Sequence, residues 1–176
     1  MGTEKTAAFV PNYSDDLYTG TAEYYARYRV PYPQVLIDDL RVRAGVTGNG
    51  RLLDLACGPG RVALSLGPFF CAVWAIDLEP DMIDVGREIA EQKGVTNVRW
   101  IVGHAEDLEA EPESFELITI GEAFHRLNQH VIPELALEWL LPGQCMVTMG
   151  CDNITKGNEP WQLLAAEVVG KWKGKG

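Results

Sequence analysis

The sequence has no excess of positive charge, no long apolar run and no signal peptide. Its 176 residues include 25 acidic and 15 basic side chains, a formal net charge of −10. Affinity for a phosphate backbone comes largely from lysine and arginine, so a nucleic-acid partner is not expected. No apolar run approaches the roughly 20 residues that span a bilayer, and the first ten residues lack the basic start and apolar centre of a signal peptide. We therefore expect a cytoplasmic protein with no membrane partner.

The chain also lacks a cysteine pattern that would cross-link it or hold a metal. Its cysteines are Cys57, Cys71, Cys145 and Cys151, and no two of them form a C-x-x-C pair. Neither a disulfide framework nor a zinc site is expected, and buried thiols are the simpler interpretation. A hydrophobic content of 47% with 23% charged residues is ordinary for one globular domain of this length. We expect it to fold without metal or disulfide support.

Stretches typical of strands alternate with stretches typical of helices. Strands are predicted over residues 52–56, 72–77, 98–102, 115–120 and 144–150. Helices are predicted from Ser14 or Thr19 to about 29, over 34–44 and 61–66, from Pro80 to Gly94, and from Pro133 to a Leu-Pro-Gly closure at 141–143. This alternation predicts an α/β fold with a doubly wound, mostly parallel sheet and right-handed crossovers.

The ends of the chain differ from this central pattern. Residues 1–13 show no period and are predicted to be disordered, whereas 14–150 are predicted to form the folded domain. Residues 151–176 are predicted to form a loop and a helix over about 160–172.

The most informative stretch is residues 52–60, Leu-Leu-Asp-Leu-Ala-Cys-Gly-Pro-Gly, in which a buried strand runs into a glycine turn. With Ala63 it satisfies the loose G-x-G-x-x-G/A pattern of dinucleotide-binding folds, a weak signal by spacing alone. Asp54 at the mouth of the turn would repel a pyrophosphate and suits a cationic ligand. A tight turn that binds nothing is the alternative.

A second candidate acid, Asp77, ends the second predicted strand. Ligands of open α/β sheets lie at the carboxyl ends of the strands, where Asp77 can accept hydrogen bonds from both ribose hydroxyls of an adenosine. Capping of the helix that begins at Pro80 is the alternative role.

Residues 52–60 resemble motif I of class I S-adenosylmethionine-dependent methyltransferases and match it at every position. The resemblance implies that S-adenosyl-L-methionine is the cofactor and S-adenosyl-L-homocysteine a product. It also implies cofactor contacts from the turn, made by Asp54, Ala56, Cys57, Gly58 and Pro59.

Two further segments resemble the same family. Ala75-Ile76-Asp77-Leu78 with Met82 looks like its second motif, which implies that Leu78 and Met82 enclose the adenine, although both could be plain core. Residues 103–108, Gly-His-Ala-Glu-Asp-Leu, resemble a G-D-A-E-D-L segment that reads the adenine edge. His104 replaces the first acid of that segment. Glu106 or Asp107 is therefore expected to accept a hydrogen bond from the adenine amino group. The backbone N–H of Ala105 is expected to donate to a ring nitrogen of the adenine. Surface charge is the alternative for these acids.

Residues 115–127 resemble a stretch of methyltransferases related to the ubiquinone and menaquinone biosynthesis enzymes. The resemblance places Gly121 at the cofactor and His125 where it could act as a base or donate to the acceptor, while Arg126 stands where the family has tryptophan. A merely exposed histidine is the alternative for His125.

Near the N-terminus, residues 24–33 resemble the corresponding segment of the same enzymes. This resemblance implies that Tyr24 and Arg29 cover the cofactor. Ordinary helix packing is the alternative for both residues.

Together these features predict a small-molecule methyltransferase with a Rossmann-like sheet, acting by in-line displacement. The last two strands of the seven-stranded methyltransferase sheet are not found, because no two strand-like runs follow Gly150. We therefore expect 151–176 to be part of a truncated acceptor-side region, in which Trp161, Leu164, Val168 and Val169 cap the acceptor or cover the sheet edge. The alternatives are an NAD-dependent oxidoreductase and a domain that binds the cofactor without catalysis. The sequence does not specify the acceptor, the methylated O, N or C atom, or the oligomeric state.

Overall fold

A computed structural model describes residues 18–150 and 157–173, and the predicted disorder of residues 1–13 lies outside them. The described chain forms a five-stranded parallel sheet in the order β3-β2-β1-β4-β5. Its strands are β1 Arg51–Leu55, β2 Ala72–Asp77, β3 Val98–Val102, β4 Phe115–Gly121 and β5 Leu140–Met149. The strand order reverses between β1 and β4, and the predicted doubly wound α/β fold is confirmed.

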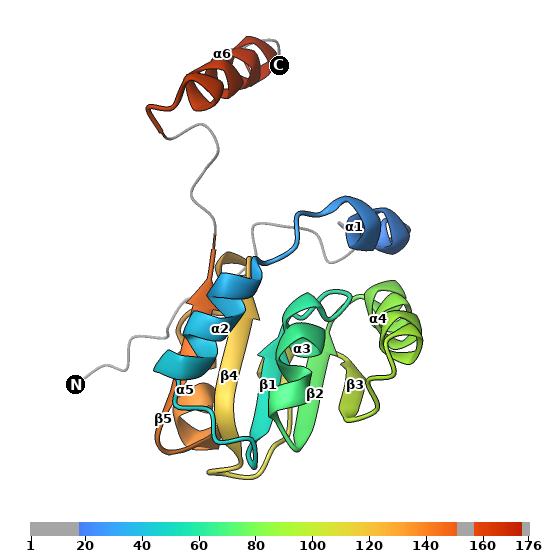
Figure 1. Cartoon of the computed structure of the whole chain (residues 1–176), viewed down its shortest axis with the longest axis vertical. Helices are drawn as coiled ribbons and strands as arrows, with labels where there is room; N and C mark the ends of the chain where they lie inside the picture. Colours follow the sequence, from blue (N-terminus) through green and yellow to red (C-terminus); the bar gives the residue numbers. More distant parts are fainter. Residues whose placement is uncertain (1–17, 151–156, 174–176) are drawn as a thin grey trace, which may run out of the picture.

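Helices cover both faces of the sheet (Figure 1). They are α1 Ala22–Tyr28, α2 Gln34–Arg43, α3 Arg61–Leu66, α4 Pro80–Gln92, α5 Val131–Trp139 and α6 Pro160–Lys173. Short 3₁₀ turns add η1 Gly67–Phe69, η2 Ala105–Asp107 and η3 Phe124–Arg126.

The two faces of the sheet carry separate apolar cores because side chains alternate along each strand. Leu52 of β1 packs with residues of α2, α3 and α4. Leu53 and Leu55, on the opposite face of the same strand, pack with residues of α5. All three leucines are fully buried, which is why β1 reads as a continuous apolar run.

Three elements differ from the predicted boundaries, and one of them, α5, begins at Val131 and not at Pro133. The first helix begins at Ala22, since a turn with Gly20 at φ +73° precedes it. The last strand begins at Leu140, directly after α5, and not at residue 144. Leu140 pairs with Phe115 and Cys145 with Leu117, so the Leu-Pro-Gly segment bulges out of the strand where it was predicted to close the helix. Proline cannot donate to a ladder, which suits a bulge.

The helix at the end of the chain does not pack as expected. Trp161, Leu164 and Val168 on α6 are 58%, 61% and 47% exposed, and Figure 1 shows α6 apart from the sheet. In the described structure these side chains therefore cap neither an acceptor site nor the edge of β5. Among residues 18–150 and 157–173, no helix combines the length and the hydropathy that crossing a membrane requires.

Candidate functional site

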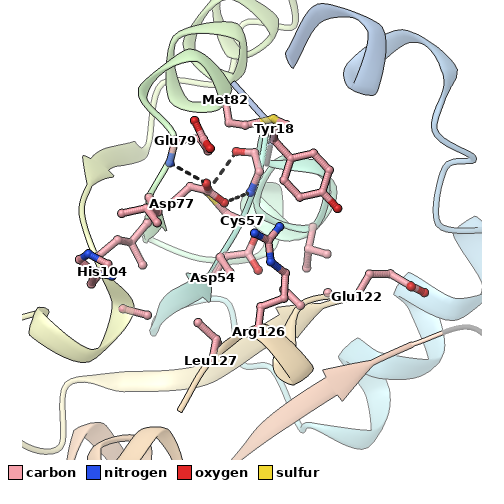
Figure 2. A pocket seen from close by; sticks show the side chains of 18 of the residues that line it. Tyr18, Asp54, Cys57, Asp77, Glu79, Met82, His104, Glu122, Arg126 and Leu127 are labelled. Atoms are coloured by element: carbon pink, nitrogen blue, oxygen red, sulfur yellow. Dashed lines mark hydrogen bonds between the residues drawn. The ribbon is translucent and has the colours of Figure 1, made fainter. Parts of the chain in front are cut away.

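A cavity of about 390 Å³ opens where the carboxyl ends of β1, β2 and β4 meet. Figure 2 shows the side chains that line it. From the predicted set, it is lined by Asp54, Ala56, Cys57, Gly58, Asp77, Leu78, Met82, Ala105, Glu106, Asp107 and Gly121. The topology thus gathers onto one cavity residues that are spread over much of the chain.

The turn after β1 has the left-handed backbone that its glycines favour. Gly58 and Gly60 have φ of +55° and +73°, and Ala56 has φ of +51°. A Cβ on Gly60 would approach Trp100 to 2.3 Å, whereas a Cβ on Gly58 would meet nothing closer than 4.0 Å. Glycine is therefore required at position 60 by both packing and backbone conformation. At position 58 it is required by backbone conformation alone, and its missing side chain leaves the cavity wall open.

Asp77 holds this turn from the end of β2. Its Oδ2 accepts the Gly58 N–H at 2.7 Å, and its Oδ1 accepts the Glu79 N–H at 3.0 Å (Figure 2). Burial raises the pKa of Asp77, while these two N–H groups and the positive charge of Arg126 act in the opposite direction. The helix-capping and ligand-binding roles predicted as alternatives are compatible, because each carboxylate oxygen retains a second acceptor position.

Asp54 does not lie at the mouth of the turn as expected. It lies beneath it, only 1% exposed, where Oδ1 accepts the Thr119 hydroxyl at 2.7 Å and Oδ2 the Ala63 N–H at 3.0 Å. Burial raises the pKa of Asp54 to about 7. The acid therefore ties β1 to β4 and α3, and its repulsion of phosphate is weaker than that of an exposed carboxylate.

The opposite wall combines apolar and polar groups. Met82 is buried at the start of α4, and Leu78, in the loop after β2, lines the same cavity. Glu106 accepts the Asn128 N–H at 2.7 Å, so this acid fastens the loop after η3 and is not mere surface charge. Ala105, also buried, begins η2 at the same wall.

Four predicted site residues lie outside the cavity lining: Tyr24, Arg29, Pro59 and His125. Tyr24 is 68% exposed and stacks on Tyr28. Arg29 forms an ion pair with Glu122 at 3.5 Å. Pro59 is buried against α4, and His125 is exposed on η3.

Several lining residues were not singled out from the sequence. They include Tyr18, Tyr32, Arg61, Glu79 and Glu122. Tyr18 reaches the cavity because Thr19 donates to Glu79 at 3.2 Å and the Gly20 N–H to Asp81 at 3.2 Å. The left-handed φ of +59° at Glu122, directly after β4, is unusual for a residue with a side chain. No periodicity signals these contacts, since they join segments about 60 residues apart.

In the described part of the chain, no three His, Cys, Asp or Glu side chains lie together so that they could hold a metal ion.

Residues 52–140, about half of the chain, match a family model described as a methyltransferase domain. An uncharacterized methyltransferase of Bacillus subtilis, YcgJ, is 36% identical over 78 residues, which are 44% of this chain and 31% of that protein. The crystal structure of YcgJ has a TM-score of 0.60 and 27% identity over 66% of this chain and 50% of that one.

The names of two other relatives indicate different acceptors. A ubiquinone biosynthesis O-methyltransferase of Cereibacter sphaeroides is 32% identical over 133 residues, 72% of this chain and 51% of that protein. An uncharacterized RNA methyltransferase of Bacillus cereus is 33% identical over 72 residues, 41% of this chain and 16% of that protein.

The chain spans about a third to a half of the length of the first curated relatives that it matches. The family match nevertheless covers the glycine turn, Asp77 and most of the sheet. The chain therefore belongs to the methyltransferase domain family, as its resemblance to class I S-adenosylmethionine-dependent methyltransferases predicted.

Proposed function

We propose that this domain binds S-adenosylmethionine in the cavity and transfers its methyl group to a small-molecule acceptor. The observation that supports this most is the joint placement of the glycine turn and Asp77. A donor–acceptor contact of 2.7 Å links them, and both line the same cavity.

The residues of the cavity fit this cofactor in size and chemistry. A volume of about 390 Å³ lies within the roughly 300–1,000 Å³ of small-molecule sites. The unused acceptor positions of Asp77 suit the two ribose hydroxyls, and Leu78 and Met82 offer apolar contact to an adenine ring. Gly58, without a side chain, leaves the backbone of the turn open to the ligand.

When bound, S-adenosylmethionine supplies an electrophilic methyl carbon on a sulfonium leaving group. The contribution of this chain is then to align the acceptor behind that carbon and to exclude water. Tyr18, whose ring lies edge-on to Tyr25 with centroids 5.6 Å apart, covers part of the cavity for this purpose. We assign no proton transfer to His125, because it lies outside the lining.

A small molecule is proposed as the acceptor in preference to RNA. The formal charge of −10 disfavours a polyphosphate backbone, although one of the relatives is an RNA methyltransferase by name. The methylated atom, whether O, N or C, is left open.

Calorimetric titration tests the cofactor assignment. S-adenosylhomocysteine is expected to bind and NADH is not, and comparable or tighter binding of NADH would favour the oxidoreductase alternative. Asp77→Asn should weaken S-adenosylhomocysteine, whereas Asp84→Asn, which removes an exposed carboxylate paired with Arg87 on α4, should not. A methyl-transfer assay with labelled S-adenosylmethionine then separates catalysis from binding alone.

A further inference from the structure

The hydroxyl of Tyr32 lies beside the carboxyl end of β4, at the wall of the cavity. Tyr32 lines the cavity, and a Cβ built on Gly121 would meet its hydroxyl oxygen at 2.5 Å and its Cζ at 3.3 Å. Gly121 is the last residue of β4, so the missing side chain there leaves the space that the phenol occupies. Among the described residues, none forms a hydrogen bond with this hydroxyl.

Tyr32 is held in place by its neighbours in sequence and in space. Pro31 and Pro33 flank it, and proline restricts both its own φ and the conformation of the residue before it. The ring packs against the apolar core that contains Leu52, and the guanidinium of Arg61 lies 5.8 Å from the ring centroid. These contacts keep the hydroxyl beside β4 without the help of a ligand.

The charges around this hydroxyl favour a cation. Burial, followed by the negative charges of Glu122 and Asp54, raises the pKa of Tyr32 to about 12. Arg61 acts in the opposite direction, and its effect is the smaller one. The phenol therefore stays neutral over the physiological range, and its oxygen keeps lone pairs that can accept. Carboxylates that disfavour a phenolate at this place favour a positive group of a ligand there.

The cavity as a whole carries more acidic than basic side chains. Six carboxylates line it: Asp54, Asp77, Glu79, Glu106, Asp107 and Glu122. Arg61 and Arg126 line it as well, beside the exposed His104. Glu122 is paired with Arg29 at 3.5 Å, and Asp54, with a pKa of about 7, is only partly ionised at neutral pH. The remaining four acids still outnumber the two arginines, so a ligand with a positive group suits this cavity.

The order of the strands places the Tyr32 hydroxyl next to the glycine turn. In the sheet, β1 lies between β2 and β4. A cofactor whose ribose meets Asp77, at the end of β2, and that extends past the turn after β1 reaches Gly121 and Tyr32 next. In S-adenosylmethionine, the group that follows the ribose is the sulfonium, which carries both the positive charge and the methyl group.

From this arrangement we propose that the Tyr32 hydroxyl recognises the methyl sulfonium and so distinguishes S-adenosylmethionine from its product, S-adenosylhomocysteine. This inference rests on the proposed function and refines it by naming a residue that recognises the charged group. The phenol oxygen accepts a weak hydrogen bond from the polarised C–H groups of the methyl. Tyr32 is thus a positioning residue: it holds the methyl beside the end of β4 and takes no proton.

Three ligands share the adenosine and the amino-acid end and differ only in the group that would meet Tyr32. S-adenosylhomocysteine has a neutral thioether there, S-adenosylmethionine has a methyl sulfonium, and sinefungin has a carbon that bears an ammonium group. Calorimetry gives the three dissociation constants for the wild type and for Tyr32→Phe, which removes the hydroxyl and keeps the ring.

Tyr32→Phe should weaken S-adenosylmethionine about two- to fivefold, because a weak C–H···O contact is lost. It should weaken sinefungin about tenfold or more, because the ammonium can form a charge-assisted hydrogen bond with the phenol oxygen. Binding of S-adenosylhomocysteine should be unchanged, which also shows that the variant is folded. Tyr28→Phe, the matched control, removes an exposed hydroxyl of α1 outside the cavity lining and should keep all three wild-type constants.

The outcomes separate this inference from the proposed function. Failure of the wild type to bind any of the three ligands contradicts the proposed function and this inference with it. If Tyr32→Phe weakens S-adenosylhomocysteine as much as the two charged ligands, the proposed function stands and the inference is overturned, because Tyr32 would then only support the cavity wall. Unchanged constants for S-adenosylmethionine and sinefungin overturn it as well, because the hydroxyl would not contact the sulfonium.

Discussion

Asp54→Asn is expected to stabilise the fold in a pH-dependent way. Among the described residues, the carboxyl of Asp54 receives two donors, the Thr119 hydroxyl and the Ala63 N–H. An asparagine can keep both contacts, because its oxygen accepts the Ala63 N–H and its amide donates to a Thr119 hydroxyl that rotates to accept. The substitution therefore removes a buried charge without leaving a buried donor unpaired.

The magnitude follows from the pKa of Asp54, about 7 in the folded protein against 3.8 for an exposed aspartate. Because the folded pKa is the higher one, ionisation favours the unfolded chain, and this acid lowers stability increasingly from about pH 4 to about pH 7. Each pKa unit of this shift corresponds to about 1.4 kcal/mol in the free energy of unfolding. Between pH 5 and pH 8 the stability gained by the asparagine variant should therefore grow by about 3 kcal/mol.

Urea denaturation of the wild type and of Asp54→Asn from pH 4 to pH 9 measures this difference. Titrating groups that do not interact with Asp54 cancel in the difference between the two proteins, and the burial of Asp54 is the largest cause of its pKa shift. Asp84→Asn, an exposed carboxylate on α4, is the control and should give a difference close to zero that does not vary with pH. A flat difference for Asp54→Asn between pH 5 and pH 8 would refute the reasoning, since it would mean that burial does not perturb this acid.

Three further predictions concern packing and binding. Gly86→Ala places a Cβ 2.6 Å from Trp100, so it should lower the free energy of unfolding in urea by about 1–3 kcal/mol. The loss should be smaller in a Trp100→Phe background, and equal losses in both backgrounds would exclude the clash. Gly58→Val should abolish calorimetric binding of S-adenosylhomocysteine because valine resists a φ of +55°, and retained binding would place the ligand elsewhere. Asp77→Asn should weaken that binding by about 1.5–3 kcal/mol; unchanged affinity would leave Asp77 a purely structural role.

The sequence predicted the fold well because the signals are local. An apolar strand, a glycine turn and a helix follow each other between residues 51 and 66, and strands buried on both faces read as continuous apolar runs. The strand ends then placed Gly58, Asp77 and Gly121 at one edge of the sheet, where the cavity lies. Topology supported the assignment of Asp77, since the carboxyl ends of parallel strands share one edge, whereas Gly58 and Gly121 were assigned from the resemblance to methyltransferases.

Contacts between distant segments could not be predicted in the same way. Tyr18 enters the cavity because Thr19 and Gly20 hydrogen-bond to residues of the loop after β2 and of α4, and no local pattern encodes such a pairing. Asp54 has a polar side chain in an apolar run, which the sequence cannot distinguish from an acid facing a ligand. Its burial becomes evident only when Thr119, on the neighbouring strand, supplies a donor.

The contact between Asp77 and Gly58 makes the shape of the turn and the binding of a ligand mutually dependent. The Gly58 N–H donates to Asp77. This hydrogen bond stabilises the turn, and the ligand does not need this N–H as a donor. The same carboxylate holds the start of α4 through the Glu79 N–H, which brings Met82 toward the cavity. A ribose bound to the remaining acceptor positions would therefore reinforce an arrangement that already exists, and little ordering free energy would be lost on binding. The two methyltransferase motifs in this chain thus act as one unit, because a single carboxylate fixes the backbone of the first and the helix of the second.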